Sequence, residues 1–183
     1  MSKSTVPRAR TGWRRFAEAL TLVVTGLLLA GFGGELLLRF LRPQIFEIHP
    51  PGMYLEDSDL GYTLTPAFEG TIRRSEFTAA VRIGEGGLRT WNGAAKDPGT
   101  FRILVLGDSQ AFGFGVEDDE TLARQLAELL AAVHPGRSID VVNGGVPGYG
   151  TADQVAYLER MGHRIDPDLI LLQFLSVNDL KEN

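Results

Sequence analysis

Hydrophobic and polar positions in the second half of the chain predict alternating strands and helices. The stretches FRILVLG (101–107), SIDVVNGG (138–145) and PDLILLQFL (167–175) are apolar runs with the length of buried strands. Between them, apolar residues recur at helical spacing over 119–133 and 151–162. Strands and helices that alternate across short connections favour a parallel sheet with right-handed crossovers. The pattern therefore predicts an α/β fold, a three-layer α/β/α domain with a flavodoxin-like parallel sheet.

A different pattern occupies residues 1–43, where a basic segment precedes an apolar one. The apolar run 16–41 carries charge only near its ends, where Glu18, Glu35 and Arg39 can reach a membrane interface. Five basic residues precede the run, and the positive-inside bias would keep them in the cytoplasm. We expect a basic cytoplasmic tail, a single-pass signal anchor and an extracytoplasmic remainder.

Two other interpretations of the apolar run stay open. One is a cleaved signal peptide, for which Gly31-Phe32-Gly33 would be a poor small-x-small cleavage site. The other is a buried helix in the core of a soluble domain.

Residues 44–100 predict a linker and a small β-rich region. Paired prolines in RPQIFEIHPPG (42–52) remove backbone donors and exclude a helix. The segments LGYTLTP (60–66) and FTAAVRIGEGGLRT (77–90) carry β-branched and aromatic residues bounded by glycine and proline, as hairpin strands do. We expect this region to pack against the domain that follows.

The charged residues of the β-rich region show no catalytic pattern. Its glutamates alternate with arginines, as on the solvated faces of strands. A carbohydrate-binding role is the alternative. The arginines in question are Arg73, Arg74, Arg82 and Arg89.

Composition and charge narrow the function classes. The 183 residues include no cysteine, so neither a disulfide framework nor a thiolate metal site can form. The formal net charge is −5, but residues 1–43 are net positive and the remainder is strongly acidic. Nucleic acid is therefore disfavoured as a partner of the main body, and we expect none. We expect no metal site and no cofactor, and we expect the glycines of FGFG (112–115) to shape a loop.

Three polar or glycine-rich segments follow the three predicted strands. They are GDSQAFGFG (107–115), NGGVPGYGT (143–151) and SVND (176–179). The carboxyl ends of parallel strands share one edge of a sheet, where ligands bind. A serine, a glycine backbone and an asparagine amide should therefore converge. That set suits acyl transfer, in which a serine oxygen attacks a carbonyl and preorganised donors stabilise the oxyanion.

The three blocks, in this order, resemble those of the SGNH hydrolases, also called GDSL esterases and lipases, over residues 101–183. The resemblance implies that Ser109 is the nucleophile, that Gly148 donates its backbone N–H to the oxyanion, and that Asn178 donates its side-chain amide. It implies a serine esterase that hydrolyses acyl esters, either O-acetylated carbohydrates or lipid esters, through an acyl-serine at Ser109. An O-acyltransferase acting on a cell-surface polysaccharide and a non-catalytic glycan-binding module stay open as alternatives.

The sequence departs from the SGNH pattern at two points. Ser176 stands where the third block usually has glycine. The base of the family is a histidine in an Asp-x-x-His block, but His49, His134 and His163 all lack an aspartate three positions before them. We therefore expect residues 101–183 to be the N-terminal part of such a domain, with an incomplete sheet. Without the base, this chain alone is expected to be inactive.

Each site residue also has a structural interpretation. Asp108 or Ser109 can cap a turn, and Asn178 can cap a helix end. Gly148 can permit a tight turn ahead of an N-cap at Thr151. An α/β-hydrolase is disfavoured because the second residue after the serine is not glycine. A dinucleotide site is disfavoured because the glycine spacing does not fit.

Overall fold

A computed structural model describes residues 10–41 and 49–176 and divides the chain into two compact units, Met1–Gln44 and Ile45–Asn183. The first unit contains the helix α1 (Arg10–Leu41). The second is mixed α/β. Its elements are β1 (Tyr54–Asp57), β2 (Gly61–Leu64), β3 (Glu69–Arg73), β4 (Thr78–Arg82), β5 (Phe101–Gly107), α2 (Ser109–Phe112), the 3-10 turn η1 (Asp118–Glu120), α3 (Leu122–Val133), β6 (Ile139–Gly145), α4 (Thr151–Ile165) and β7 (Leu169–Leu172).

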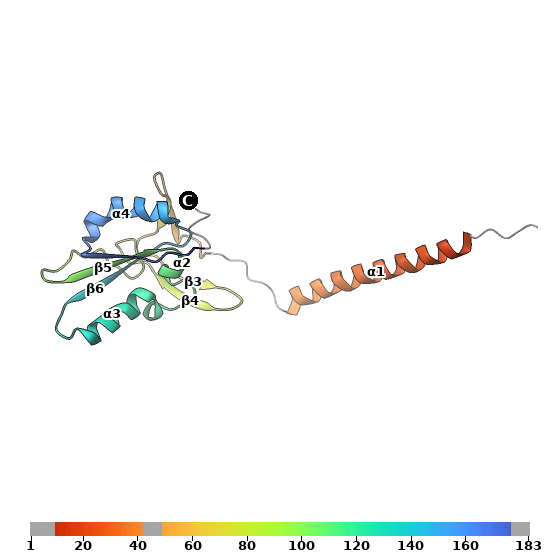
Figure 1. The fold of residues 1–183 in the computed structure, drawn as a ribbon, viewed down its shortest axis with the longest axis horizontal. Coiled ribbons are helices and arrows are strands. Elements are labelled where there is room, and N and C mark those ends of the chain that lie inside the picture. Colours follow the sequence, from red (N-terminus) through yellow and green to blue (C-terminus); the bar gives the residue numbers. More distant parts are fainter. Residues whose placement is uncertain (1–9, 42–48, 177–183) are drawn as a thin grey trace, which may run out of the picture. The chain divides into compact units, whose positions relative to one another are not determined.

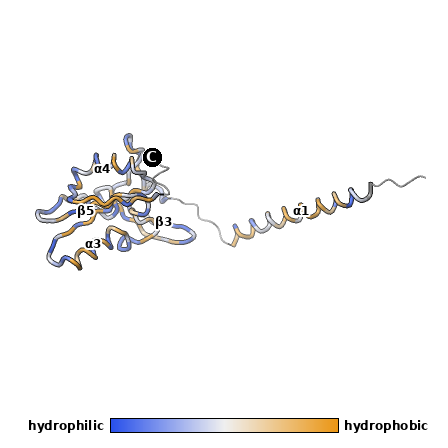
Figure 2. The backbone as a smooth tube through the Cα atoms, viewed as in Figure 1, coloured by the Kyte–Doolittle hydropathy of each residue, from blue (hydrophilic) through white to orange (hydrophobic). Residues whose placement is uncertain are grey.

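The helix α1 is continuous over 32 residues, about 48 Å at 1.5 Å per residue. Its segment Gly12–Leu41 is long and apolar enough to cross a membrane, and Figure 2 shows its apolar character. None of these side chains is buried. Near the C-terminal end, Arg39 Nε donates to Glu35 Oε1 at 2.7 Å, so these two charges compensate each other. The predicted apolar helix is confirmed, and it is of the kind that forms a membrane span or signal anchor.

The strands β5, β6 and β7 form a parallel sheet in the order β6-β5-β7 (Figure 1). The strand β5 is central, because Leu104 pairs with Val142 on one side and with Ile170 on the other. In chain order the first strand of this sheet lies between the second and the third. Flavodoxin-like sheets have the same order in their first three strands. The predicted α/β fold with a parallel sheet is confirmed.

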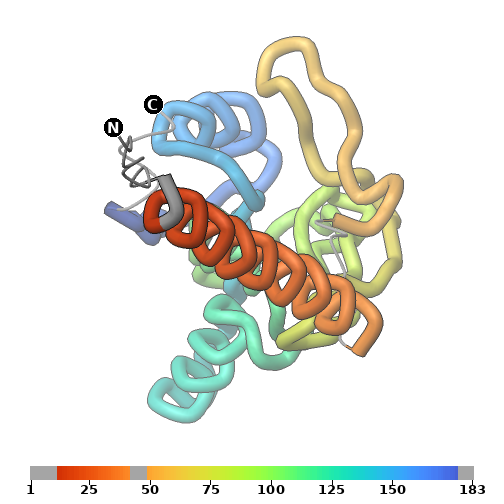
Figure 3. The backbone as a smooth tube through the Cα atoms, turned by 90° about the vertical axis from the view of Figure 1, so that its right-hand side faces the viewer, coloured from red at the N-terminus to blue at the C-terminus, as the bar shows by residue number. Residues whose placement is uncertain are grey.

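Successive residues of β5 point to opposite faces of the sheet, and each face meets a helix. Leu104 and Leu106 belong to the core that includes Tyr157 of α4, whereas Val105 packs with Ala123 of α3. The helices α3 and α4 therefore lie on opposite sides of the sheet, as Figures 1 and 3 show.

The strand β7 has less cover than its neighbours. All four of its residues are between 38% and 51% exposed, whereas the residues of β5 after Phe101 are buried. Within the described part of the chain, the predicted cover on both faces therefore holds for β5 but not for β7.

The β-rich region forms two antiparallel hairpins, β1–β2 and β3–β4. The pattern predicts β2 and β4, but not β1 and β3, because YLED and EGTIR carry few apolar residues. Both hairpins pack on the α/β part. Asp57 accepts a hydrogen bond from Arg160 of α4 at 2.6 Å, and the Ala80 N–H donates to Glu117 at 3.1 Å. The predicted packing of this region is confirmed.

One arginine of the β-rich region contradicts the expectation of solvated charge. The side chain of Arg89 is fully buried beside Asp118, whereas Arg73 and Arg82 are exposed. The surface interpretation is wrong for Arg89, because this guanidinium finds its acceptors inside the protein.

Candidate active site

Ser109 lies on a sharp strand-to-helix turn at the end of β5. It is the first residue of the four-residue helix α2. Asp108 is the N-cap, and its buried carboxylate accepts a hydrogen bond from the Gln110 N–H at 2.8 Å. The capping role therefore belongs to Asp108, and the half-buried Ser109 side chain lines a pocket instead.

Backbone hydrogen bonds fix the C-terminal end of the short helix α2, which follows the Ser109 turn. Gly113 has a φ of +83° and donates its N–H to the carbonyl oxygens of Ser109 and Gln110, both at 3.1 Å. A left-handed residue at this position favours glycine. From β6, Asn143 Nδ2 donates to the Phe112 carbonyl oxygen at 3.2 Å. The glycines of this loop thus shape it, as predicted.

Gly148 lies in a second tight turn, after β6. Its φ is +87°, and a Cβ added there would lie 2.5 Å from the hydroxyl oxygen of Tyr62. That hydroxyl donates to the Pro147 carbonyl oxygen at 2.8 Å. Both the backbone conformation and the close approach of Tyr62 require glycine at this position. Among the described residues, no acceptor is hydrogen-bonded to the Gly148 N–H.

The helix that follows begins differently from the prediction. The N-cap of α4 is Gly150, whose N–H donates to Asp153 Oδ2 at 3.0 Å. The prediction of Thr151 as the N-cap is wrong, because the Asp153 carboxylate caps the helix start from inside the first turn and Thr151 is already helical.

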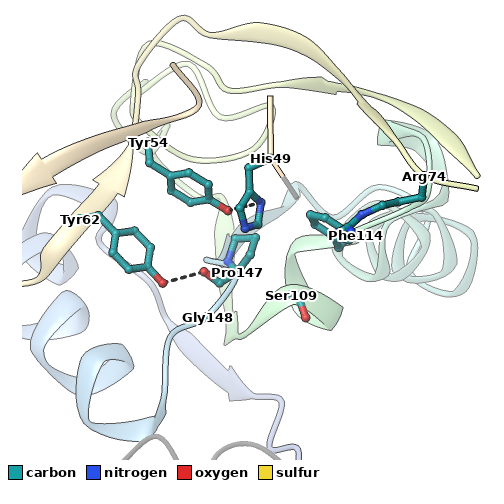
Figure 4. Close-up of a pocket in the computed structure, with 8 residues that line it drawn as sticks. All are labelled: His49, Tyr54, Tyr62, Arg74, Ser109, Phe114, Pro147 and Gly148. Carbon is teal, nitrogen blue, oxygen red and sulfur yellow. Dashed lines mark hydrogen bonds between the residues drawn. The ribbon is translucent and has the colours of Figure 1, made fainter. Parts of the chain in front are cut away.

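Ser109 and Gly148 line the same pocket, which has a volume of about 640 Å³ (Figure 4). The structure therefore brings together two of the three residues that the sequence analysis selected. The third, Asn178, lies outside the described residues. Gln173, just after β7, donates its Nε2 to Gln110 Oε1 at 3.0 Å, so the end of the third strand reaches the Ser109 turn.

The opposite wall of the pocket is aromatic and comes largely from the β-rich region. The ring of His49 packs edge-on against Tyr54 at 4.8 Å and against Phe114 at 5.6 Å between centroids. Tyr54 in turn packs edge-on against Tyr62 at 5.2 Å. Sequence analysis missed these rings. Tyr54 and Tyr62 reach the pocket only through the docking of the β1–β2 hairpin.

Among the described residues that line the pocket, one side chain carries a permanent charge. Burial, and secondarily the positive charge of Arg74, lowers the pKa of His49. Burial also raises the pKa of Tyr54. Near neutral pH both rings are therefore uncharged, and Arg74 is the permanently charged side chain among the described residues that line the pocket. Its guanidinium lies over the Phe114 ring, 5.7 Å from the centroid.

His49 is a wall residue in this arrangement. Its Nδ1 is hydrogen-bonded to the Tyr54 hydroxyl at 3.1 Å, and the Ser109 hydroxyl points away from the imidazole (Figure 4). In the part of the chain that the structure describes, no group of three or more histidine, aspartate and glutamate side chains could hold a metal ion.

Comparison with known proteins finds a partial similarity to an esterase. The chain is 31% identical to an arylesterase of Vibrio mimicus over 78 residues, which is 43% of this chain and 38% of that protein. It therefore spans well under half the length of this relative. No family model matches the chain.

Proposed function

We propose that the protein is a serine esterase of the SGNH hydrolase type with Ser109 as its nucleophile. The proposal is carried by the juxtaposition of Ser109 and Gly148 in one pocket, at the carboxyl ends of the adjacent strands β5 and β6. A hydroxyl and a backbone N–H at one cavity are two groups that acyl transfer requires. Similarity to an arylesterase supports the same class of reaction.

In the proposed reaction, the Ser109 oxygen attacks the carbonyl carbon of a bound ester while its proton passes to a base. The charge that develops on the carbonyl oxygen is stabilised by the Gly148 N–H and the Asn178 amide. Cleavage of the ester C–O bond releases the alcohol, which takes up the proton, and water then hydrolyses the acyl-serine. The SGNH resemblance implies a histidine base in an Asp-x-x-His block, a pattern that this sequence does not contain.

The residues that line the pocket favour small ester substrates that carry a ring and are either uncharged or negatively charged. Aromatic residues supply most of the surface opposite Ser109, and no carboxylate is among the described lining residues. Rings favour edge-to-face contacts with other rings, and the similar protein is an arylesterase. We therefore choose phenyl esters of short acids as test substrates.

The test uses the full-length protein, meaning the complete product of the gene, because the histidine base that the resemblance implies is not among these 183 residues. The readouts are hydrolysis of phenyl acetate and covalent labelling by a fluorophosphonate. Ser109→Ala should abolish both. Asn178→Ala should lower kcat by about a hundredfold to a thousandfold, the usual loss for one oxyanion donor, and leave labelling detectable.

The control for these variants is Ser58→Ala, in the exposed turn between β1 and β2. It should retain wild-type hydrolysis and labelling. Labelling of Ser109→Ala at the wild-type rate would remove Ser109 from the reaction.

A further inference from the structure

Arg89 is a buried cation whose hydrogen-bonding capacity is fully used. Its side chain has no exposed surface, and a guanidinium carries five N–H donors. Each donor has a partner within 3.2 Å. The Nε donates to Asp118 Oδ1, one terminal nitrogen to the carbonyl oxygens of Phe112 and Gly113, and the other to those of Ala80 and Val116.

Four of the five acceptors belong to the segment that directly follows Ser109. Phe112 and Gly113 carry the carbonyl groups at the C-terminal end of α2, and Val116 and Asp118 fix the loop beyond it. The guanidinium also lies over the Phe112 ring, 5.0 Å from the centroid. The planar guanidinium points its N–H groups in fixed directions and thus holds several points of one loop together. A flexible lysine ammonium cannot do this.

Stability alone does not account for this arrangement. Burying a charge costs several kcal/mol, and apolar side chains of similar volume often stabilise a fold as well or better. In some proteins, the benefit of such a buried polar site is a defined geometry. Here that geometry is the path of the chain from the Ser109 turn to Phe114, which lines the pocket.

We propose that Arg89 is a positioning residue that holds the Ser109 turn in its reactive geometry. The β-rich region would then be part of the catalytic apparatus rather than a separate binding module. The role for Ser109 rests on the proposed function, whereas the fixing of residues 110–116 by Arg89 does not.

The test compares Arg89→Lys with Arg82→Met in the full-length protein. The lysine keeps a positive charge beside Asp118 but loses the planar guanidinium and its five directed N–H donors. Arg82 is a matched control, because it donates to the same carboxylate at 2.7 Å but is 65% exposed. The readouts are kcat and KM for phenyl acetate, the fraction of sites labelled by a fluorophosphonate, and hydrogen exchange of the amides of residues 110–116.

We expect Arg89→Lys to lower kcat per labelled site by about tenfold to a hundredfold, as small misplacements of reacting groups do. KM should change by less than about threefold, because the wall residues His49, Tyr54 and Tyr62 lie outside residues 110–116. Exchange at residues 110–116 should accelerate in this variant but not in Arg82→Met, whose kinetics should match the wild type.

Two results would overturn the proposal. One is an unchanged kcat per labelled site with only a smaller labelled fraction, which means that Arg89 serves folding alone. The other is unchanged exchange at residues 110–116 in folded Arg89→Lys. If wild-type protein is neither active nor labelled, the proposed function fails, and the exchange comparison still decides whether Arg89 fixes this turn.

Discussion

His49 shows how its surroundings change the chemistry of a single side chain. Burial and the nearby guanidinium of Arg74 lower its pKa from the usual 6.5, so the neutral ring is favoured in the folded protein. Protonation would add a second cation to the pocket wall beside Arg74. Between the lowered pKa and 6.5 the unfolded chain binds more protons than the folded one, so stability falls as the pH drops through this window.

We predict that replacing His49 weakens the pH dependence of the free energy of unfolding in this window. The free energy of unfolding of the wild type should fall as the pH decreases from 7.5 towards 5, beginning near 6.5. His49→Phe, which keeps an aromatic ring, should lose less stability over the same interval. Urea unfolding at several pH values measures this difference.

The control for the pH profile is His134→Gln, at the exposed C-cap of α3. This variant should follow the wild-type profile. A wild-type profile for His49→Phe would show that another group titrates in this window.

At the scale of elements, periodicity predicts the α/β part well and the hairpins poorly. Runs such as FRILVLG fix β5 because burial on both faces leaves few polar positions. Ser109 and Gly148 follow from the rule that strand ends meet at one edge. The roles of Tyr62 and Arg89 depend on how the hairpins dock, which contacts between distant segments decide. A charged residue in a strand-like stretch is usually exposed, but Arg89 is buried, as is Arg102 in β5.

The central strand of the sheet should contribute strongly to the stability of the second unit. Leu104, in the central strand, is completely buried. Leu104→Ala should lower the free energy of unfolding by about 2 to 5 kcal/mol, the usual cost of truncating a core leucine. Leu129→Ala on α3, where the leucine is 60% exposed, should change it by less than about 0.5 kcal/mol.

Urea unfolding followed by tryptophan fluorescence measures both variants, because Trp91 is buried in the core. A loss below about 1 kcal/mol for Leu104→Ala would mean that the packing around β5 contributes little to the stability of this unit.

At the scale of the whole molecule, charge and apolar surface are divided along the chain. The basic residues that precede the apolar run 16–41 contrast with the strongly acidic remainder of the chain, and α1 is long enough to span a bilayer. We propose that α1 is an uncleaved anchor with its N-terminus in the cytoplasm, because Lys and Arg flanking a span favour the cytoplasmic side. The second unit, which contains the Ser109 pocket, would then lie outside the cytoplasm.

The absence of cysteine from the sequence allows this orientation to be measured with single introduced thiols. In cells with an intact cytoplasmic membrane, Ser58→Cys, in the exposed turn between β1 and β2, should react with a membrane-impermeant maleimide. Ser4→Cys should react only after the membrane is permeabilised, because the positive-inside bias holds the basic segment in the cytoplasm. The reverse pattern would overturn the orientation. Release of Ser58→Cys protein into the soluble fraction, with a shortened chain, would show that the apolar segment is a cleaved signal peptide.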